Sequence, residues 1–193
     1  ELVAGRLYAE GVISSAESIQ EIVFRQSAEY AEVRLIPEAG MPESGNLKDV
    51  KPGYWAPEWI FALADRFKEG MPLHDRTRAA HSCFLACGNR LLFQCEDIGR
   101  HNAADKVIGF ALLKEIDPAE CIIYSSGRIP ADMAAKAIRA KIPVLVSKAA
   151  PTSEAVALAK EYGLTLIGAA RSDSMRVYYD GRVSERQETI ITR

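Results

Sequence analysis

The chain has 193 residues and a mass of 21.2 kDa, and 48% of its residues are hydrophobic, so it can bury one sizeable core and form one domain with extensions. Its 24 Lys and Arg residues nearly balance its 26 Asp and Glu residues, and the net charge of −2 argues against a protein that coats nucleic acid. Its apolar runs are far shorter than the ~20 residues that a membrane-spanning helix needs. We therefore expect no nucleic-acid or membrane partner, and any anion-binding site must be local.

The cysteine pattern bears on compartment and on metal binding. Cys83, Cys87, Cys95 and Cys121 have spacings that fit neither a zinc ribbon nor a dense disulfide framework, and no signal peptide precedes them. We therefore expect a cytoplasmic protein with reduced thiols and no metal. A zinc-dependent nucleotide deaminase would need a His or Cys two residues before a Glu, and a Pro-Cys-x-x-Cys segment. Neither motif occurs here, so the deaminase alternative lacks its metal ligands.

The N-terminal part of the chain carries the patterns of short elements. Apolar residues at helical spacing predict a helix over residues 2–11, and a serine at position 14 or 15 is a candidate cap for a second short helix through Ile19 and Val23. Alternation predicts a half-buried strand over 30–36. The stretch 37–46 is rich in Pro, Gly and acidic residues, which predicts an exposed loop.

A new pattern begins near Pro57, which suits the first turn of a helix whose apolar stripe ends near Gly70. Two strand-like runs, 81–87 and 90–95, then flank Gly88-Asn89, a pair that accepts positive φ and predicts a hairpin. We accordingly interpret residues 1–55 as an N-terminal extension and residues 56–193 as the main α/β domain.

The rest of the chain alternates between helices and strands. It predicts helices over 102–115, near Pro130 and over 153–162, strands over 121–125, 144–147 and 164–169, and a terminal hairpin in which Asp180-Gly181 joins 175–179 to a strand from Arg182 onward. Such βαβ units make neighbouring strands parallel and cover both faces of the sheet with helices. The fold class is therefore α/β, a three-layer α/β/α sandwich with a β-hairpin and parallel βαβ units.

Ligands of open α/β sheets bind beyond the carboxyl ends of the strands, where helix N-termini offer unpaired N–H groups. Four predicted strands end in polar, Gly-containing segments that carry Arg100, Arg128, Lys148 and Arg171. If these ends converge, they suit a phosphorylated, nucleotide-like ligand. The alternative is that each segment only caps its helix, because Ser, Thr, Asn and Asp are favoured capping residues.

Two histidines are candidates for roles at this edge. His101 lies beside two carboxylates and could transfer a proton or orient a ligand, because imidazole titrates near neutral pH; a structural use is equally open. His81 opens a predicted strand, where a hydrogen-bonded packing role is the more common one.

One long motif supports a resemblance to a known family. Residues 96–109 read Glu-Asp-Ile-Gly-Arg-His-Asn-Ala-Ala-Asp-Lys-Val-Ile-Gly, which resembles the signature of the FdhD/NarQ family of formate dehydrogenase accessory proteins. Further stretches resemble the family's early helix and its later motifs in order: 7–13, 125–129, 143–153 and 164–171. The family usually has an additional β-rich segment before the position of Glu1.

The resemblance implies a cytidine-deaminase-like α/β/α fold and a sulfur carrier, a sulfurtransferase-like activity. In such a system a cysteine desulfurase loads a persulfide, and the carrier passes its sulfur to the molybdenum bis-guanine-dinucleotide cofactor (Mo-bis-MGD) before insertion into formate dehydrogenase. It also implies a homodimer, which we associate with the apolar residues flanking Trp55 and Trp59. The strand ends, together with the family's last motif, indicate these cofactor-binding residues: Asp97, Arg100, His101, Asn102, Ser126, Gly127, Arg128, Ile167, Gly168, Ala169, Ala170, Arg171 and Ser172.

The chain departs from the family at its reactive loop. Family members usually present Cys-x-x-Cys between the strand at 30–36 and a Leu-Asp segment, whereas the corresponding positions here resemble Ala39 and Pro42. The catalytic residues are therefore unknown, and we do not transfer the sulfur-carrying role to the strand cysteines. Two functions stay open: a sulfur carrier, or a chaperone that binds the cofactor or the dehydrogenase without carrying sulfur.

Overall fold

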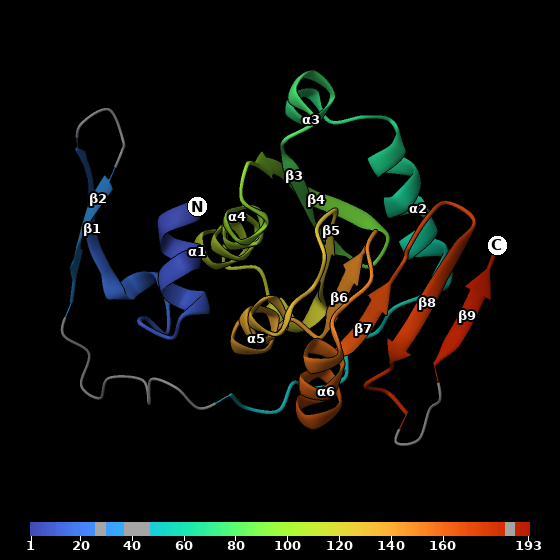
Figure 1. Ribbon diagram of the computed structural model, residues 1–193. Coiled ribbons are helices and arrows are strands. Elements are labelled where there is room, and N and C mark those ends of the chain that lie inside the picture. The colour runs from blue at the N-terminus through green and yellow to red at the C-terminus, as the bar shows by residue number, and fades with distance from the viewer. Residues whose placement is uncertain (26–29, 37–46, 184–187) are drawn as a thin grey trace.

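The computed structural model describes residues 1–25, 30–36, 47–183 and 188–193. A seven-stranded sheet in the order β4-β3-β5-β6-β7-β8-β9 forms the centre, with helices on both faces, and a separate two-stranded sheet, β1-β2, stands apart from it (Figure 1). The chain is thus a mixed α/β fold.

From residue 57 onward the elements follow the predicted order, except that α3 was not predicted. The helices are α1 (Leu2–Ala9), α2 (Pro57–Lys68), α3 (Pro72–Thr77), α4 (Arg100–Leu113), α5 (Ala131–Arg139) and α6 (Ser153–Tyr162), with short 3-10 turns at Ala16–Ser18 and Pro118–Glu120. The strands are β1 (Ile19–Arg25), β2 (Tyr30–Leu35), β3 (His81–Cys87), β4 (Arg90–Asp97), β5 (Cys121–Ser125), β6 (Val144–Ser147), β7 (Thr165–Gly168), β8 (Ser174–Tyr179) and β9 (Thr189–Thr192).

The predicted helix through Ile19 and Val23 is wrong, because this segment is strand β1. It pairs antiparallel with β2, so that Ile22 lies opposite Val33. β-Branched residues favour a pleated strand, and β2 supplies the partner that satisfies the backbone of β1. The helical spacing of the two apolar residues is therefore coincidental. The predicted strand at 30–36 is confirmed, while the predicted loop at 37–46 lies outside the described residues.

Strand β3 sets the direction of the sheet. It pairs antiparallel with β4 on one side and with β5 on the other, so β4 and β5 run the same way. Strands β5, β6 and β7 are parallel to one another, as the βαβ pattern predicts. The carboxyl ends of β4, β5, β6 and β7 consequently all lie at one edge of the sheet, next to His81 at the start of β3.

Each face of the sheet has its own hydrophobic core. On one face Phe84, Tyr124 and Val146 pack with residues of α2. On the opposite face Leu85 and Ile123 pack with residues of α4, α5 and α6. Side chains of a strand alternate between the two faces, and the parallel strands β5 and β6 are buried on both. This alternation is why the central strands are almost entirely apolar.

Helix α1 packs against α4 through two glycines. A Cβ atom at Gly5 would overlap the carbonyl oxygen of Asp105, and one at Gly109 would overlap the carbonyl oxygen of Glu1. The two helix backbones therefore approach more closely than side chains would permit, and Ala9 joins the core of the main domain. The division at residue 55 stays a prediction.

One expectation about the C-terminal region needs correction. The terminal strands do pair, but β9 begins at Thr189, and Arg182 is no part of it. Arg182 instead forms a double hydrogen bond with buried Asp180, with distances of 2.9 and 2.8 Å, and donates to the carbonyl oxygen of Trp55 at 2.8 Å. Trp55 lies beneath this guanidinium and is only 2% exposed, whereas the neighbouring Tyr54 is 73% exposed. The homodimer stays a prediction.

Within the described residues, no helix combines the length and the apolar character required to cross a membrane.

Replacing Gly5 by Ala should force α1 away from α4. We expect Gly5→Ala to lower the free energy of unfolding by about 1–3 kcal/mol or more, as overpacking does, measured by urea denaturation. Gly11→Ala is the matched control, because a Cβ at this position meets no atom within 4 Å. An alanine at its φ of +73° should lower the free energy of unfolding by about 1 kcal/mol through backbone strain alone. Equal losses in the two variants would show that close helix packing is not the cause.

Candidate functional site

The four predicted strand ends converge, as the direction of β3 requires. Backbone hydrogen bonds join the loops that follow these strands: the amide of Lys148 donates to the carbonyl oxygen of Ser125 at 3.0 Å, and the amide of Ala170 donates to that of Ser147 at 2.9 Å. The hydroxyl of Ser147 also donates to the carbonyl oxygen of Gly127 at 2.6 Å. The loops after β5, β6 and β7 thus form one continuous polar edge.

Two neighbouring cavities lie along this edge on the α2 side of the sheet, with volumes of about 340 and 550 Å³. They share Phe67, Lys68 and Lys148 as lining residues, and we call them together the edge trough. The smaller cavity is lined also by Ala64, Tyr124, Ala170, Arg171, Ser172 and Asp173. The larger is lined also by Gly70, Met71, His74, Asp75, Arg78, Ala79, Ala80, His81, Ser82 and Ser126.

Cations outnumber carboxylates in the lining of the edge trough. Lys68, Arg78, Lys148 and Arg171 line it, against Asp75 and Asp173. The ammonium group of Lys148 lies 6.0 Å from the centre of the Phe67 ring. Cationic side chains around an apolar floor suit a ligand that combines phosphate with a flat ring.

Tyr124 forms part of the floor of the smaller cavity. Its hydroxyl donates to the carbonyl oxygen of Ala170 at 2.8 Å, and burial raises its pKa strongly, although the charge of Arg171 works in the opposite direction. Tyr124 is therefore neutral at physiological pH and holds the loop that carries Arg171.

Arg100 lies against Gly127 near His81, which lines the larger cavity. Its Nε atom is buried and has no hydrogen-bond partner among the described residues. A Cβ at Gly127 would lie 2.9 Å from the Cβ of Arg100 and 3.4 Å from the Nδ1 of His81. Glycine at 127 thus lets the loop after β5 pass against Arg100 and His81, close to this buried guanidinium nitrogen.

His81 lies between this loop and the edge trough. The Oγ of Ser126 accepts a hydrogen bond from the amide of Ser82 at 3.0 Å and lies 3.5 Å from the Nδ1 of His81. Burial lowers the pKa of His81, and the positive charges of Arg100 and His74 lower it further. His81 is consequently a neutral hydrogen-bonding group in a cationic setting.

Asp97 and Asn102 hold the loop before α4 together, although no side chain caps the helix itself. The Oδ1 of Asp97 accepts from the amide of Gly99 at 3.0 Å and from the Nδ2 of Asn102 at 3.1 Å, and its other oxygen pairs with Lys106 at 2.7 Å. Burial alone would raise the pKa of Asp97, but these hydrogen bonds lower it. Its oxygens are thus engaged within the loop.

His101 faces α5 and does not line the edge trough. Its Nε2 lies 3.5 Å from the Oδ2 of Asp132, and one turn further along the two helices Asp105 pairs with Lys136 at 2.5 Å. Burial lowers the pKa of His101, the Asp132 carboxylate opposes this, and Arg100 reinforces it. His101 therefore belongs to the polar contact between α4 and α5.

The remaining predicted residues are distributed unevenly. Arg128 is exposed beyond β5, and Ile167 and Gly168 are fully buried, with Gly168 packed against Pro151 and Tyr178. Ala169 lies at the turn between Gly168 and Ala170, with a φ of 48°. Of the predicted set, Ser126, Ala170, Arg171 and Ser172 line the edge trough directly. Whether any of them contacts a cofactor stays a prediction.

Sequence patterns gave no indication of the wall that α2 and α3 contribute. Phe67 and Lys68 come from the end of α2, and His74 comes from α3. Glu96 positions α3, because its carboxylate accepts from the amides of Leu73 and His74, each at 2.7 Å. Glu96, the first residue of the family-like motif, is the one signal that could have indicated this contact.

The thiols differ from those of an activated nucleophile. All four cysteines are free, and burial raises the pKa of each, to about 11 for Cys95 and about 12 for Cys121. Raised values keep a thiol protonated and unreactive at neutral pH. Ala39 and Pro42, the positions that resemble the family's cysteine pair, lie outside the described residues.

The two histidines allow a direct check of these environments. In NMR titrations we expect His81 to titrate below the usual value of about 6.5, and Arg100→Gln to raise its pKa by removing a neighbouring cation. Asp132→Asn should lower the pKa of His101 further and leave that of His81 unchanged. A His81 pKa at or above the usual value in the unmodified protein would contradict the assignment.

Comparison with known proteins identifies the family. The profile of the FdhD/NarQ family matches residues 40–184. The chain is 33% identical over 215 positions to a sulfur carrier protein FdhD of Streptomyces avermitilis, an alignment that covers 92% of this chain and 76% of that protein. It is 31% identical to the sulfur carrier protein FdhD of Bacillus subtilis, covering 92% of this chain and 77% of that one.

A solved structure supports the same assignment. The crystal structure of a protein from Desulfotalea psychrophila, assigned as a formate dehydrogenase accessory protein, matches with a TM-score of 0.74 and 34% identity, covering 92% of this chain and 75% of that one. Sequence profile, relatives and fold agree, and the chain belongs to the FdhD/NarQ family.

Proposed function

We propose that this protein is an accessory factor of formate dehydrogenase that holds Mo-bis-MGD, as cargo, in the edge trough while a sulfur atom from a cysteine desulfurase is added to it. The observation that carries the proposal is the set of cations gathered at the carboxyl edge of the sheet, including the buried, unpaired Nε of Arg100. The names of the relatives support the accessory role and the link to sulfur.

The chemistry of the edge trough fits the cargo. A guanine dinucleotide carries phosphates and a flat purine ring, and Lys148, Arg171 and Arg100 offer charged donors for the phosphates. The backbone N–H groups at the start of α4 add partial positive charge beside Arg100, since no side chain caps this helix. Phe67 and Tyr124 provide apolar and aromatic surface for a ring.

The sulfur step places a separate demand on the chain. A persulfide carrier needs an accessible thiolate that attacks the terminal sulfur of the desulfurase persulfide, so that the desulfurase thiolate leaves. The carrier later passes this terminal sulfur on to the acceptor. The four thiols of this chain all have raised pKa values, and Cys83 and Cys121 are fully buried. This observation favours a second candidate: a chaperone that holds the cofactor while sulfur passes to it from another protein.

Binding of GDP, measured by calorimetry, tests the edge trough. A hydrogen bond from a charged group contributes about 1.5–3 kcal/mol, so we expect Arg171→Ala to weaken GDP binding at least ~10-fold, and Arg128→Ala to weaken it less because that side chain is exposed outside the lining. Lys114→Ala is the control: this exposed lysine follows α4 at the opposite edge and should have no effect. Unchanged affinity in both arginine variants would refute cofactor binding in the edge trough.

Intact-protein mass spectrometry separates the two candidates. After incubation with a cysteine desulfurase and cysteine, a sulfur carrier gains sulfur that a reductant removes, whereas a chaperone gains none. Given the raised thiol pKa values, we expect no gain on the 193-residue chain at neutral pH. A reductant-sensitive gain that a single Cys→Ser variant abolishes would establish that cysteine as the carrier.

A further inference from the structure

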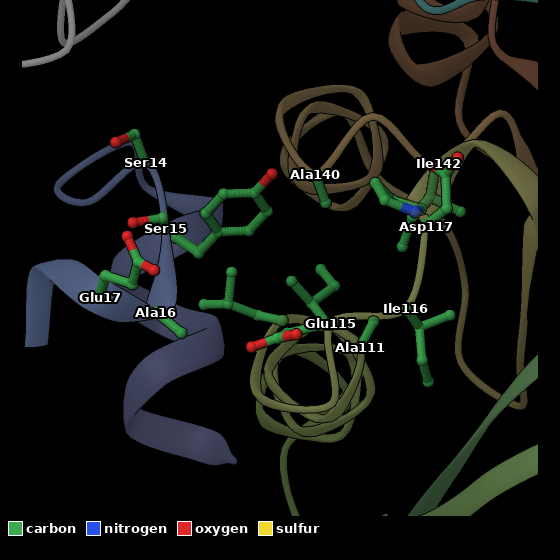
Figure 2. Close-up of a pocket in the computed structure, with 14 residues that line it drawn as sticks. Ser14, Ser15, Ala16, Glu17, Ala111, Glu115, Ile116, Asp117, Ala140 and Ile142 are labelled. Carbon is green, nitrogen blue, oxygen red and sulfur yellow. The ribbon is translucent and has the colours of Figure 1, made fainter.

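A second cavity, of about 480 Å³, lies at the opposite edge of the sheet, near the starts of β5 and β6 (Figure 2). We call it the C-cap pocket, because the carboxyl ends of α4 and α5 form it together with the segment after α1. Its lining is largely apolar and includes Tyr8, Ile108, Leu112, Ile116 and Ile142. A cavity of this size is in the range of ligand sites.

The C-cap pocket is built from two helix caps of the same type. At the end of α4 the amide of Ile116 donates to the carbonyl oxygen of Ala111 at 3.0 Å, and at the end of α5 the amide of Ile142 donates to that of Ala137 at 3.0 Å. These are Schellman caps, in which the residue before each isoleucine has positive φ. The two isoleucines that follow the caps both line the cavity.

In both caps the residue with positive φ is charged, although glycine adopts positive φ at the lowest energetic cost. Glu115 has a φ of 52° and Lys141 one of 57°, whereas the end of α6 uses Gly163 for the same purpose. Only the first of the two charged residues lines the C-cap pocket. Its carboxylate is thus held at the rim at the expense of backbone strain.

The electrostatic character of the C-cap pocket is negative. Glu17, Glu115 and Asp117 line it, and no Lys, Arg or His of the described chain does. Figure 2 shows Glu17 on one side of the space and Glu115 with Ala111 on the other. The ends of α4 and α5 add the partial negative charge of helix C-termini. The nearest lysines in sequence, Lys114 and Lys141, are exposed outside the lining.

We propose that the C-cap pocket is a docking site for a basic, apolar segment of a partner protein, in which a large aliphatic side chain enters the cavity and neighbouring Arg or Lys side chains pair with the rim carboxylates. The apolar lining supplies the surface for the aliphatic group, and the three carboxylates with the two helix ends select the positive charge. Val12 and Leu113, 44% and 45% exposed, add apolar surface in the adjoining turns.

The position of this site permits two ligands at once. The C-cap pocket is at the amino ends of the parallel strands, and the edge trough is at their carboxyl ends. A partner docked in the C-cap pocket would leave the edge trough open to an anionic ligand. The docking proposal does not depend on what the edge trough binds.

Methyl NMR of the chain with synthetic peptides tests the proposal. An eight-residue peptide of alternating leucine and arginine should shift the methyl signals of Ala111, Ile116, Ala140 and Ile142 in a saturable manner. Peptides of alternating leucine and glutamate, or serine and arginine, should not shift them. Glu115→Gly should lower the affinity for the leucine–arginine peptide about three-fold, as the loss of one exposed charge pair does. The double variant that also carries Glu17→Gln should lower this affinity about ten-fold.

A matched variant separates charge from cap strain. Glu115→Gly and Lys141→Gly both place glycine at a positive φ, so both should raise the melting temperature, but only the first should weaken peptide binding. The proposal is overturned if the leucine–glutamate peptide binds equally well, if both glycine variants bind alike, or if no peptide shifts these methyl groups. Saturation by the uncharged molecule cyclohexanol, with no gain in affinity from positive charge in a peptide, would instead identify a small-molecule site.

Discussion

The antiparallel placement of β3 between β4 and β5 is the constraint on which the rest of the structure depends. Because β3 reverses direction on both sides, β4 and β5 run the same way, and β6 and β7 follow them. Four strand ends, and the loops that carry Arg100, Lys148 and Arg171, are thereby brought to one edge. A different position for the hairpin strand would separate Arg100 from the other cations.

Helix α4 links the two edges of the molecule. Its first turn brings Arg100 beside Gly127 and His81, and its last turn forms a wall of the C-cap pocket. Between them the helix is buried on nearly all sides, since the sheet covers one side and α1 covers the other through the close glycine contact. Such a helix cannot tilt without moving both Arg100 and the wall of the C-cap pocket.

The buried ion pair between Asp105 and Lys136 belongs to the same arrangement. Asp105 has no accessible surface and is held by Lys136 of α5 at 2.5 Å, with Arg6 of α1 at 3.9 Å. Burial raises the pKa of Asp105, and the neighbouring cations oppose this. Removing one partner of such a pair leaves an uncompensated buried charge, which destabilises the fold much more than replacing both partners by apolar residues. The pair therefore fixes how three helices meet rather than adding much net stability.

The family assignment and the local chemistry address different questions. Membership of the FdhD/NarQ family follows from the profile match, the relatives and the fold. The raised pKa values of the thiols follow mainly from burial, because strands β3, β4 and β5 place Cys83, Cys95 and Cys121 within or against the core. The cationic edge and the thiols thus support holding an anionic cofactor more directly than they support carrying sulfur.

The sequence by itself determined most of the order of elements from Pro57 onward, the hairpin at Gly88-Asn89, the parallel βαβ units and the four cationic strand ends, because these depend on local periodicity and on glycine and proline positions. It did not indicate α3 or the start of β9. The prediction of a helix at Ile19–Arg25 was wrong, because pairing with β2 makes this segment a strand. Only the tertiary structure separated His101, turned toward α5, from His81 at the edge trough, and only it brought α2, α3 and the two helix caps to their cavities. Those contacts join residues distant in the chain, and their geometry is set by packing that no local pattern encodes.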